Sequence, residues 1–273
     1  MNFIEIIKVF ILGIVEGITE WLPVSSTGHM LLLDEFIQLD ASSEFKNMFF
    51  IFIQLGAIFA VVLIFWKKMV PFQFKNKNRP IIKKDIFTIW FKVAFACIPG
   101  AVATIFFDDI VDSYLEGPVV IALALIFYGV VFILVENRNK NKRYKINEIS
   151  QITYRYAFII GLFQILSIIP GTSRSGSTII GGLLVGVSRV AVAEFTFFMA
   201  VPVMLGMSFL EILDYGLNFT GNEFLLLIFG MFVAFAVSLL VIRFLMAYIR
   251  KNDFKLFGYY RIVLGIVVLL YFI

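Results

Sequence analysis

Cysteine, histidine and charge are all scarce in this chain of 273 residues. The single cysteine, Cys97, excludes an internal disulfide and a CxxC site. The single histidine, His29, excludes a zinc site made of several imidazoles. Charged residues make up only 15% of the chain, a composition that excludes a soluble enzyme, a nucleic-acid-binding protein and a disordered scaffold. The net charge of +4 is therefore no sign of a nucleic-acid partner.

Apolar residues are abundant instead. They make up 61% of the chain, against roughly 45–50% in a typical soluble protein, and the mean hydropathy is +0.96. Several uncharged runs approach the about 20 residues that a helix needs to cross a bilayer. The sequence therefore predicts an all-α polytopic membrane protein. The uncharged or nearly uncharged runs are residues 49–66, 86–107, 117–135, 156–173, 195–210, 224–242 and 256–273.

The loops between these runs divide by charge. Residues 67–84, 138–145 and 250–255 are basic, whereas residues 108–116 and 214–223 form turns without a basic side chain. Basic loops stay on the cytoplasmic side of a membrane. We therefore expect the two acidic turns, and with them both termini, on the outer side.

This topology requires the segment from 156 to 189 to cross the membrane an even number of times. The segment is apolar, but Pro170, Gly171 and Gly176 interrupt it. Non-helical backbone at membrane depth is tolerated only where protein or a water-filled cavity surrounds it. We therefore predict a helix pair that enters from one side and returns to it.

The N-terminal segment has the same order of features, because residues 25–28 align with residues 173–176 when the preceding apolar stretches are superposed. Corresponding loops of the two halves carry opposite charge. We predict one membrane domain over residues 1–273, with inverted repeats 1–136 and 153–273 joined by the basic cytoplasmic linker 137–152. The fold has about six transmembrane helices and two re-entrant helix pairs, and its binding site lies where the broken helices meet.

Two carboxylates stand in the first apolar stretch. Glu16 and Glu20 are four residues apart, so they share one face of a helix. They also exclude a cleavable signal peptide. Acidic side chains inside a membrane usually have a function, and carboxylate oxygens suit Mg²⁺ or Ca²⁺. We predict a divalent-cation site, with a mutually satisfied polar pair as the alternative.

Hydroxyl groups follow directly. Pro23 ends the first helix, and Ser25, Ser26, Thr27 and Gly28 begin the second. Hydroxyls and free N–H groups at a helix start form an anion site. Simple capping is the alternative for each hydroxyl. His29, one turn on, is the side chain able to exchange protons near neutral pH.

Arg174 occupies the corresponding break in the second half, next to Ser173, Ser175 and Gly176. An arginine between apolar helices needs an anion, and its planar guanidinium fits phosphate in a bidentate manner. The alternative is a salt bridge to Glu16 or Glu20 that holds the two halves together.

Other polar side chains in or near the apolar runs have no clustered partners in the sequence. We interpret Lys92, Glu194 and Arg261 as structural or interfacial residues. Two Gly-x-x-x-Gly pairs, at 13 and 17 and at 182 and 186, indicate close helix packing.

The two polar segments resemble the signature motifs of a known family. The stretch 16–29, EGITEWLPVSSTGH, and the stretch 170–176, PGTSRSG, are similar to those of the undecaprenyl-diphosphatase, or bacitracin-resistance, family. The resemblance covers nearly the whole chain. Trp21 stands where phenylalanine is usual, and Thr172 where other side chains occur, but neither change removes a chemical group.

The resemblance implies a multi-pass enzyme of the bacterial plasma membrane that hydrolyses undecaprenyl diphosphate to the monophosphate and inorganic phosphate. This reaction recycles the carrier lipid for peptidoglycan synthesis and confers bacitracin resistance. The site is expected to be accessible from the extracytoplasmic side. The expected partners are the polyprenyl diphosphate substrate and membrane lipid, with no nucleic acid. A homodimer is compatible with the sequence. The expected catalytic residues are Glu20, Ser26, His29 and Arg174; the phosphate-binding residues are Ser25, Thr27, Gly28, Ser173, Arg174, Ser175 and Gly176; the ligands of a divalent cation, Mg²⁺ or Ca²⁺, are Glu16 and Glu20.

Two questions stay open at this point. Family resemblance suggests Ser26 as the nucleophile, with His29 accepting its proton or protonating the leaving group, but a metal-bound water is an equally valid nucleophile. A secondary transporter or flippase is the rival class, because inverted repeats with broken helices are a transporter architecture. A phosphohistidine mechanism is excluded, since it uses two histidines.

Overall fold

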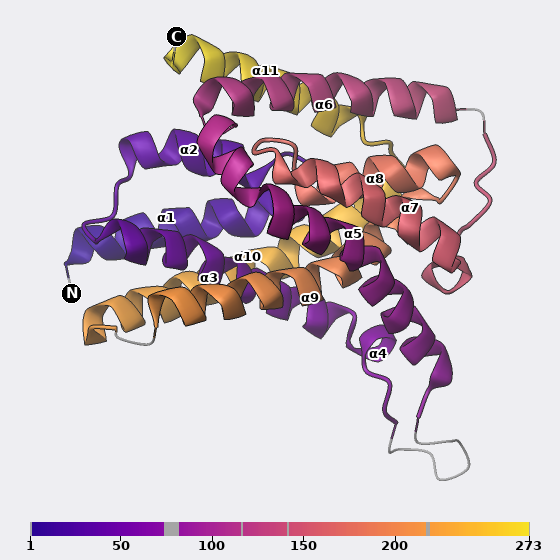
Figure 1. Cartoon of the computed structure of the whole chain (residues 1–273), viewed down its shortest axis with the longest axis horizontal. Coiled ribbons are helices and arrows are strands. Elements are labelled where there is room, and N and C mark those ends of the chain that lie inside the picture. The colour runs from indigo at the N-terminus through magenta and orange to yellow at the C-terminus, as the bar shows by residue number, and fades with distance from the viewer. Residues whose placement is uncertain (1, 74–81, 116, 141, 217–218, 273) are drawn as a thin grey trace.

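Six helices of the computed structural model are long and apolar enough to cross a membrane, counted over the described residues 2–73, 82–115, 117–140, 142–216 and 219–272. Most of them run roughly along one direction (Figure 1). The predicted all-α polytopic membrane fold is confirmed. The six helices are α3 (Ser43–Ile64), α5 (Lys84–Tyr114), α6 (Pro118–Asn139), α9 (Arg189–Tyr215), α10 (Gly221–Ile249) and α11 (Lys255–Phe272).

Two pairs of shorter helices complete the bundle. The first pair is α1 (Phe3–Thr19) and α2 (Ser26–Phe36). The second consists of α7 (Tyr154–Gln164), extended by the 3₁₀ turn η2 (Ile165–Ile168), and α8 (Arg174–Val185). The second helix of each pair has 11 or 12 residues, a length of about 17–18 Å where a bilayer core needs about 30 Å. Each pair therefore has the form predicted for a re-entrant hairpin.

The two halves of the chain follow the same order, a short helix pair and then three long helices. Helix α1 packs on α10 and α7 packs on α5, while α3 contacts α9 and α6 contacts α11. These are the contacts that two halves related by a two-fold axis would make. The division into inverted repeats at 1–136 and 153–273 stays a prediction.

The helix ends are where the sequence prediction was wrong. Helix α5 continues to Tyr114, so most of the predicted acidic turn 108–116 is helical. Helix α10 continues to Ile249 and includes Arg243. The predicted runs stopped at their first charged residues, but charge alone does not end a helix, and the long side chain of Arg243 can extend toward water without breaking α10.

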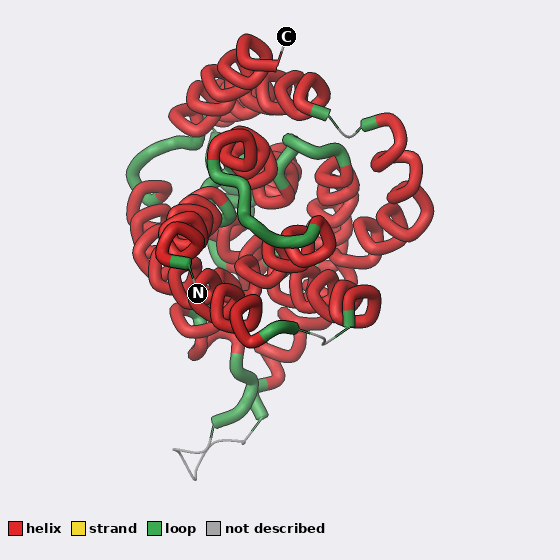
Figure 2. Tube along the Cα trace, turned by 90° about the vertical axis from the view of Figure 1, so that its left-hand side faces the viewer, coloured by secondary structure: helices red, strands yellow, loops and turns green. Residues whose placement is uncertain are grey.

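The ends of the bundle differ. The start of α1, the end of α11 and the start of α10 lie at one end, whereas the short helix α4 (Trp66–Met69) and the described part of the linker lie toward the other (Figure 1). Viewed along the bundle, the helices are seen nearly end-on, with α6 and α11 together at one edge (Figure 2). Helix α4, which carries Lys67 and Lys68, and the described part of the basic linker thus lie toward the end opposite the termini (Figure 1), and the side of the membrane that each end faces stays a prediction.

Small residues allow the first helix pair to approach its neighbours closely. A Cβ atom added at Gly13 or Gly17 would lie 3.0 Å or 2.8 Å from a carbonyl oxygen of α10. Gly182 packs equally closely on Val192 of α9. Gly186 is different, because its φ of 92° ends α8 in the left-handed conformation that glycine adopts without strain. Three of the four predicted packing glycines therefore lie in helix contacts.

Candidate active site

The turns of the two helix pairs meet inside the bundle. Arg174, the first residue of α8, donates from Nη2 to Oε1 of Glu20 over 2.8 Å. The hydroxyl of Ser175 lies 3.4 Å from the carbonyl oxygen of Glu20. Both carboxylate and guanidinium are largely buried. The structure thus brings together the motifs that the sequence predicted to form one site.

Each turn ends in a serine with unusual backbone geometry. Ser25 has a φ of 72° and Ser173 a φ of 73°, and no other non-glycine residue in the described part of the chain has a positive φ. Such a conformation costs about 1–3 kcal/mol and is concentrated at functional sites. Each serine caps the helix that follows, because its hydroxyl accepts from the N–H of Gly28 or Gly176. The starts of α2 and α8 are therefore fixed in the same way.

Glu20 lies at the centre of the site and uses both carboxylate oxygens. Oε1 accepts from Arg174, and Oε2 accepts from the hydroxyl of Ser26 over 3.1 Å. Glu20 follows the last residue of α1, where the chain leaves the helix toward Pro23. This arrangement places a carboxylate in position to take the proton of the Ser26 hydroxyl.

His29 is held by two hydrogen bonds, neither of them to Ser26. Its Nδ1 lies 2.8 Å from the carbonyl oxygen of Ser25, which can only accept, so Nδ1 carries a proton. Its Nε2 lies 2.6 Å from the hydroxyl of Tyr260, and the two rings stack at a centroid distance of 5.5 Å. In the neutral ring Nε2 is therefore the acceptor. Sequence reasoning did not identify Tyr260, which precedes Arg261 on α11.

Glu16 completes the acidic pair on α1. Its side chain is 1% exposed, and Oε1 has no hydrogen-bond partner. Nη1 of Arg174 is also buried without a partner. The described residues contain no group of three or more histidine, cysteine, aspartate or glutamate side chains around one point. Mg²⁺, however, binds through one or two carboxylates and completes its shell with water and substrate phosphate, so Glu16 and Glu20 fit the predicted cation.

Arg261 is the main residue whose part in the site the sequence did not reveal. Its side chain is fully buried. Nη1 donates to the carbonyl oxygen of Pro23 over 3.3 Å, and Nη2 donates to those of Gly171 and Thr172 over 2.8 Å each. One guanidinium thus joins both turns. An arginine in the last apolar run was visible in the sequence, but its partners are backbone carbonyls, which no side-chain pattern indicates.

The remaining predicted residues line the same two turns. Ser175 is buried and lies 3.2 Å, oxygen to oxygen, from Ser173. Gly28 packs against α6, where an added Cβ would lie 3.0 Å from Leu125. An added Cβ at Gly176 would lie 3.3 Å from Nη1 of Arg261. The side chain of Thr27 is exposed.

Comparison with known proteins places these motifs in a family. A family model described as bacitracin resistance protein BacA matches residues 9–267. The chain belongs to the BacA family. The matched residues of this BacA-family chain include both turns, Arg174 and Arg261.

Curated relatives of this BacA-family chain cover all or nearly all of its length. A protein of Enterococcus faecalis named undecaprenyl-diphosphatase is 65% identical over 99% of this chain and 98% of its own. Proteins with the same name from Lachnoclostridium phytofermentans and Desulfitobacterium hafniense are 58% and 56% identical, each over 100% of this chain and over 99% and 98% of their own.

Proposed function

We propose that this chain is an undecaprenyl-diphosphatase that removes the terminal phosphate of undecaprenyl diphosphate and so recycles the carrier lipid for peptidoglycan synthesis. The observation that carries the proposal is the chain of hydrogen bonds from Arg174 through Glu20 to Ser26 at the meeting point of two helix starts. The names of the relatives support it.

The site binds a phosphate through its own donors. The first N–H groups of α2 and α8 have no intrahelical partner beyond those capped by Ser25 and Ser173, and helix starts favour anions. The unpaired Nη1 of Arg174 adds a charged donor. Donors fixed before the substrate arrives stabilise the charge of the transition state without further reorganisation.

Ser26 is the proposed nucleophile. Its oxygen attacks the terminal phosphorus while Glu20 accepts the hydroxyl proton, and the bond from that phosphorus to the bridging oxygen breaks. The lipid monophosphate leaves and the phosphoserine is then hydrolysed by water to inorganic phosphate. Direct attack by water, with Glu20 as the base, is the competing route. In either case His29 exchanges a proton with the leaving group through Nε2, which must first release the Tyr260 hydroxyl.

Glu16 and Glu20 are the residues that would hold a divalent cation. A bound Mg²⁺ or Ca²⁺ would supply positive charge against the diphosphate oxygens. The buried and unpartnered Oε1 of Glu16 supports this assignment.

The experiment is phosphate release from undecaprenyl diphosphate by the purified protein in detergent, with and without Mg²⁺. We expect release by the parent, with a loss of at least about 10³-fold in Glu20→Gln and Arg174→Gln, since both remove transition-state contacts. Arg155→Gln, which changes an exposed arginine on α7, is the matched control and should keep full activity. A parent that binds the lipid and releases no phosphate would instead favour the transporter class.

The site is proposed to open to the extracytoplasmic side. A cysteine at Tyr114, which is 79% exposed at the end of α5, should react with an impermeant thiol reagent on intact cells when Cys97 is replaced by serine. A cysteine at Arg155, in the first turn of α7, should be protected until the cells are opened. The reverse pattern would overturn this orientation.

A further inference from the structure

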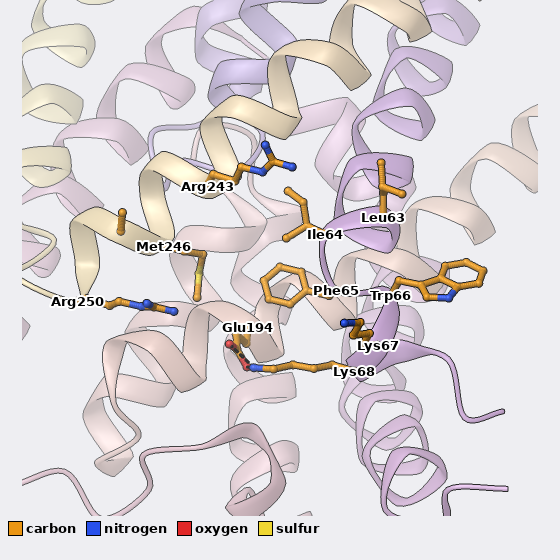
Figure 3. A pocket seen from close by; sticks show the side chains of 11 residues that line it. Leu63, Ile64, Phe65, Trp66, Lys67, Lys68, Glu194, Arg243, Met246 and Arg250 are labelled. Atoms are coloured by element: carbon orange, nitrogen blue, oxygen red, sulfur yellow. Dashed lines mark hydrogen bonds and ion pairs between the residues drawn. The ribbon is translucent and has the colours of Figure 1, made fainter. Parts of the chain in front are cut away.

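A pocket of about 750 Å³ lies apart from the active site, where α3, α4, α9 and α10 come together (Figure 3). It contains none of the residues of the two helix-pair turns. Its wall is part apolar and part basic. The charged side chains that line it are Lys67, Lys68, Glu194, Arg243 and Arg250.

The pocket has an excess of positive charge. Its only lining carboxylate, Glu194, is already paired with Lys68, at 2.7 Å. The side chains of Lys67, Arg243 and Arg250 make no ion pair or hydrogen bond with any described residue. Three cationic side chains therefore surround this space without a counter-ion from the described protein.

The position of Arg243 makes this excess significant. It is exposed on α10 two turns before Ile249 ends the helix, about 9 Å along the helix axis. An arginine on the lipid-facing surface of a membrane helix is unfavourable unless it reaches the interface or an anion. Arg243 and Arg250 both line the pocket from α10, with Met246 between them (Figure 3).

Apolar surface continues from the charged part of the pocket. Leu63 and Trp66 are each 55% exposed at the end of α3 and the start of α4. On α10, Phe244 and Leu240 are 57% and 69% exposed next to Arg243. Tryptophan at this depth is typical of the membrane interface. A charged head group and an acyl chain would thus find matching surfaces side by side.

We propose that this pocket binds the phosphate head group of an anionic phospholipid, with Arg243 and Arg250 as the phosphate ligands and the flank of α3 and α10 against the acyl chain. Guanidinium groups bind phosphate oxygens in a bidentate manner, and basic pockets between membrane helices bind acidic head groups. The bound lipid fixes the basic end of α10 against α3 and α9.

The test compares lipid retention by the intact protein in native mass spectrometry. Phosphatidylglycerol and phosphatidylcholine with identical acyl chains are titrated into the parent, into the double variant Arg243→Gln/Arg250→Gln and into a control, Arg138→Gln/Arg155→Gln. The control removes the same charge from exposed arginines of α6 and α7 that make no ion pair among the described residues. We expect the parent to prefer phosphatidylglycerol, and the pocket variant to lose at least about tenfold of that preference, because it lacks both charged phosphate contacts. The control should behave as the parent.

Each other outcome overturns the proposal. Equal retention of both lipids by the parent would show that the pocket does not select an anionic head group. An equal loss of preference in the control would show that the effect follows the net charge of the protein and not the pocket. If inorganic phosphate fully displaces phosphatidylglycerol, the pocket is a site for free anions. If the protein retains undecaprenyl phosphate in place of phosphatidylglycerol, the pocket binds the reaction product. Phosphate release should be unchanged in the pocket variant, which separates a failure here from a failure of the proposed enzyme.

Discussion

Replacement of Arg261 by lysine should slow the reaction far more than it weakens substrate binding. Arg261 joins Pro23 in one turn to Gly171 and Thr172 in the other through three hydrogen bonds. A lysine ammonium is a single point and cannot span both turns as the guanidinium fork does. At least one buried carbonyl is then left without a donor, which costs about 1–3 kcal/mol.

The hydrogen bonds that are lost are those that hold the two turns of the site together. Displacing one turn by about 1 Å moves Ser26 and Arg174 relative to each other, and such a displacement can cost up to about 10²-fold in rate. We expect kcat of Arg261→Lys to fall about 10-fold to 100-fold while KM changes less than about threefold. The melting temperature in detergent should also fall. Arg261→Met leaves all three carbonyls unpaired and should cost at least about 3 kcal/mol of stability, at about 1–3 kcal/mol for each buried unpaired group.

Arg189→Lys is the control for these measurements. Arg189 forms a buried bidentate ion pair with Glu136, from Nε over 2.9 Å and from Nη2 over 2.5 Å, at the start of α9. Its replacement should lower the melting temperature in the same way and leave kcat unchanged. If Arg261→Lys behaves like this control, with lower stability and full kcat, Arg261 does not position the site.

Three further changes test the site itself. Tyr260→Phe removes the hydrogen bond to Nε2 of His29 and should lower kcat by about 10-fold with little effect on the melting temperature, a result that an unchanged kcat would contradict. Glu20→Gln and Arg174→Gln should each cost about 3 kcal/mol of stability, measured by thermal unfolding, because each leaves one buried charge unpaired. The double variant should regain most of that stability but no activity, since neither charge is then present. A double variant whose loss of stability equals the sum of the two single losses would refute this coupling. Ser26→Ala should abolish turnover if the serine is the nucleophile, and nearly full phosphate release would assign the attack to water.

The sequence was sufficient to predict the site where its residues are contiguous. Glu16 and Glu20 are one helical turn apart, and the hydroxyls follow directly, so the spacing alone groups them. The contact with Arg174 was predictable too, since a buried cation needs a counter-charge and the other break held carboxylates. The structure selects Glu20 as its partner.

The rest depended on contacts that a side-chain pattern does not contain. Arg261 binds backbone carbonyls, and Tyr260 binds the single imidazole. The carbonyls that face α11 are determined by the packing of α11 on α6 and α2. The role of His29 changed for the same reason. Its proximity to Ser26 in sequence suggested a base for the serine, whereas in the structure both ring nitrogens are engaged elsewhere and Glu20 accepts that hydrogen bond.

The two strained serines indicate what kind of site this is. Glycine would adopt a φ near 72° without cost, so the side chain at Ser25 and Ser173 must compensate for the strain that a non-glycine residue brings. Each hydroxyl caps the N–H of a glycine two positions inside the next helix, which fixes the direction of the remaining N–H donors. The same device in both turns, held together by Arg261, fixes the two helix starts and Arg174 relative to each other. Catalysis of phosphoryl transfer depends mainly on position and fixed charge, and this arrangement supplies both.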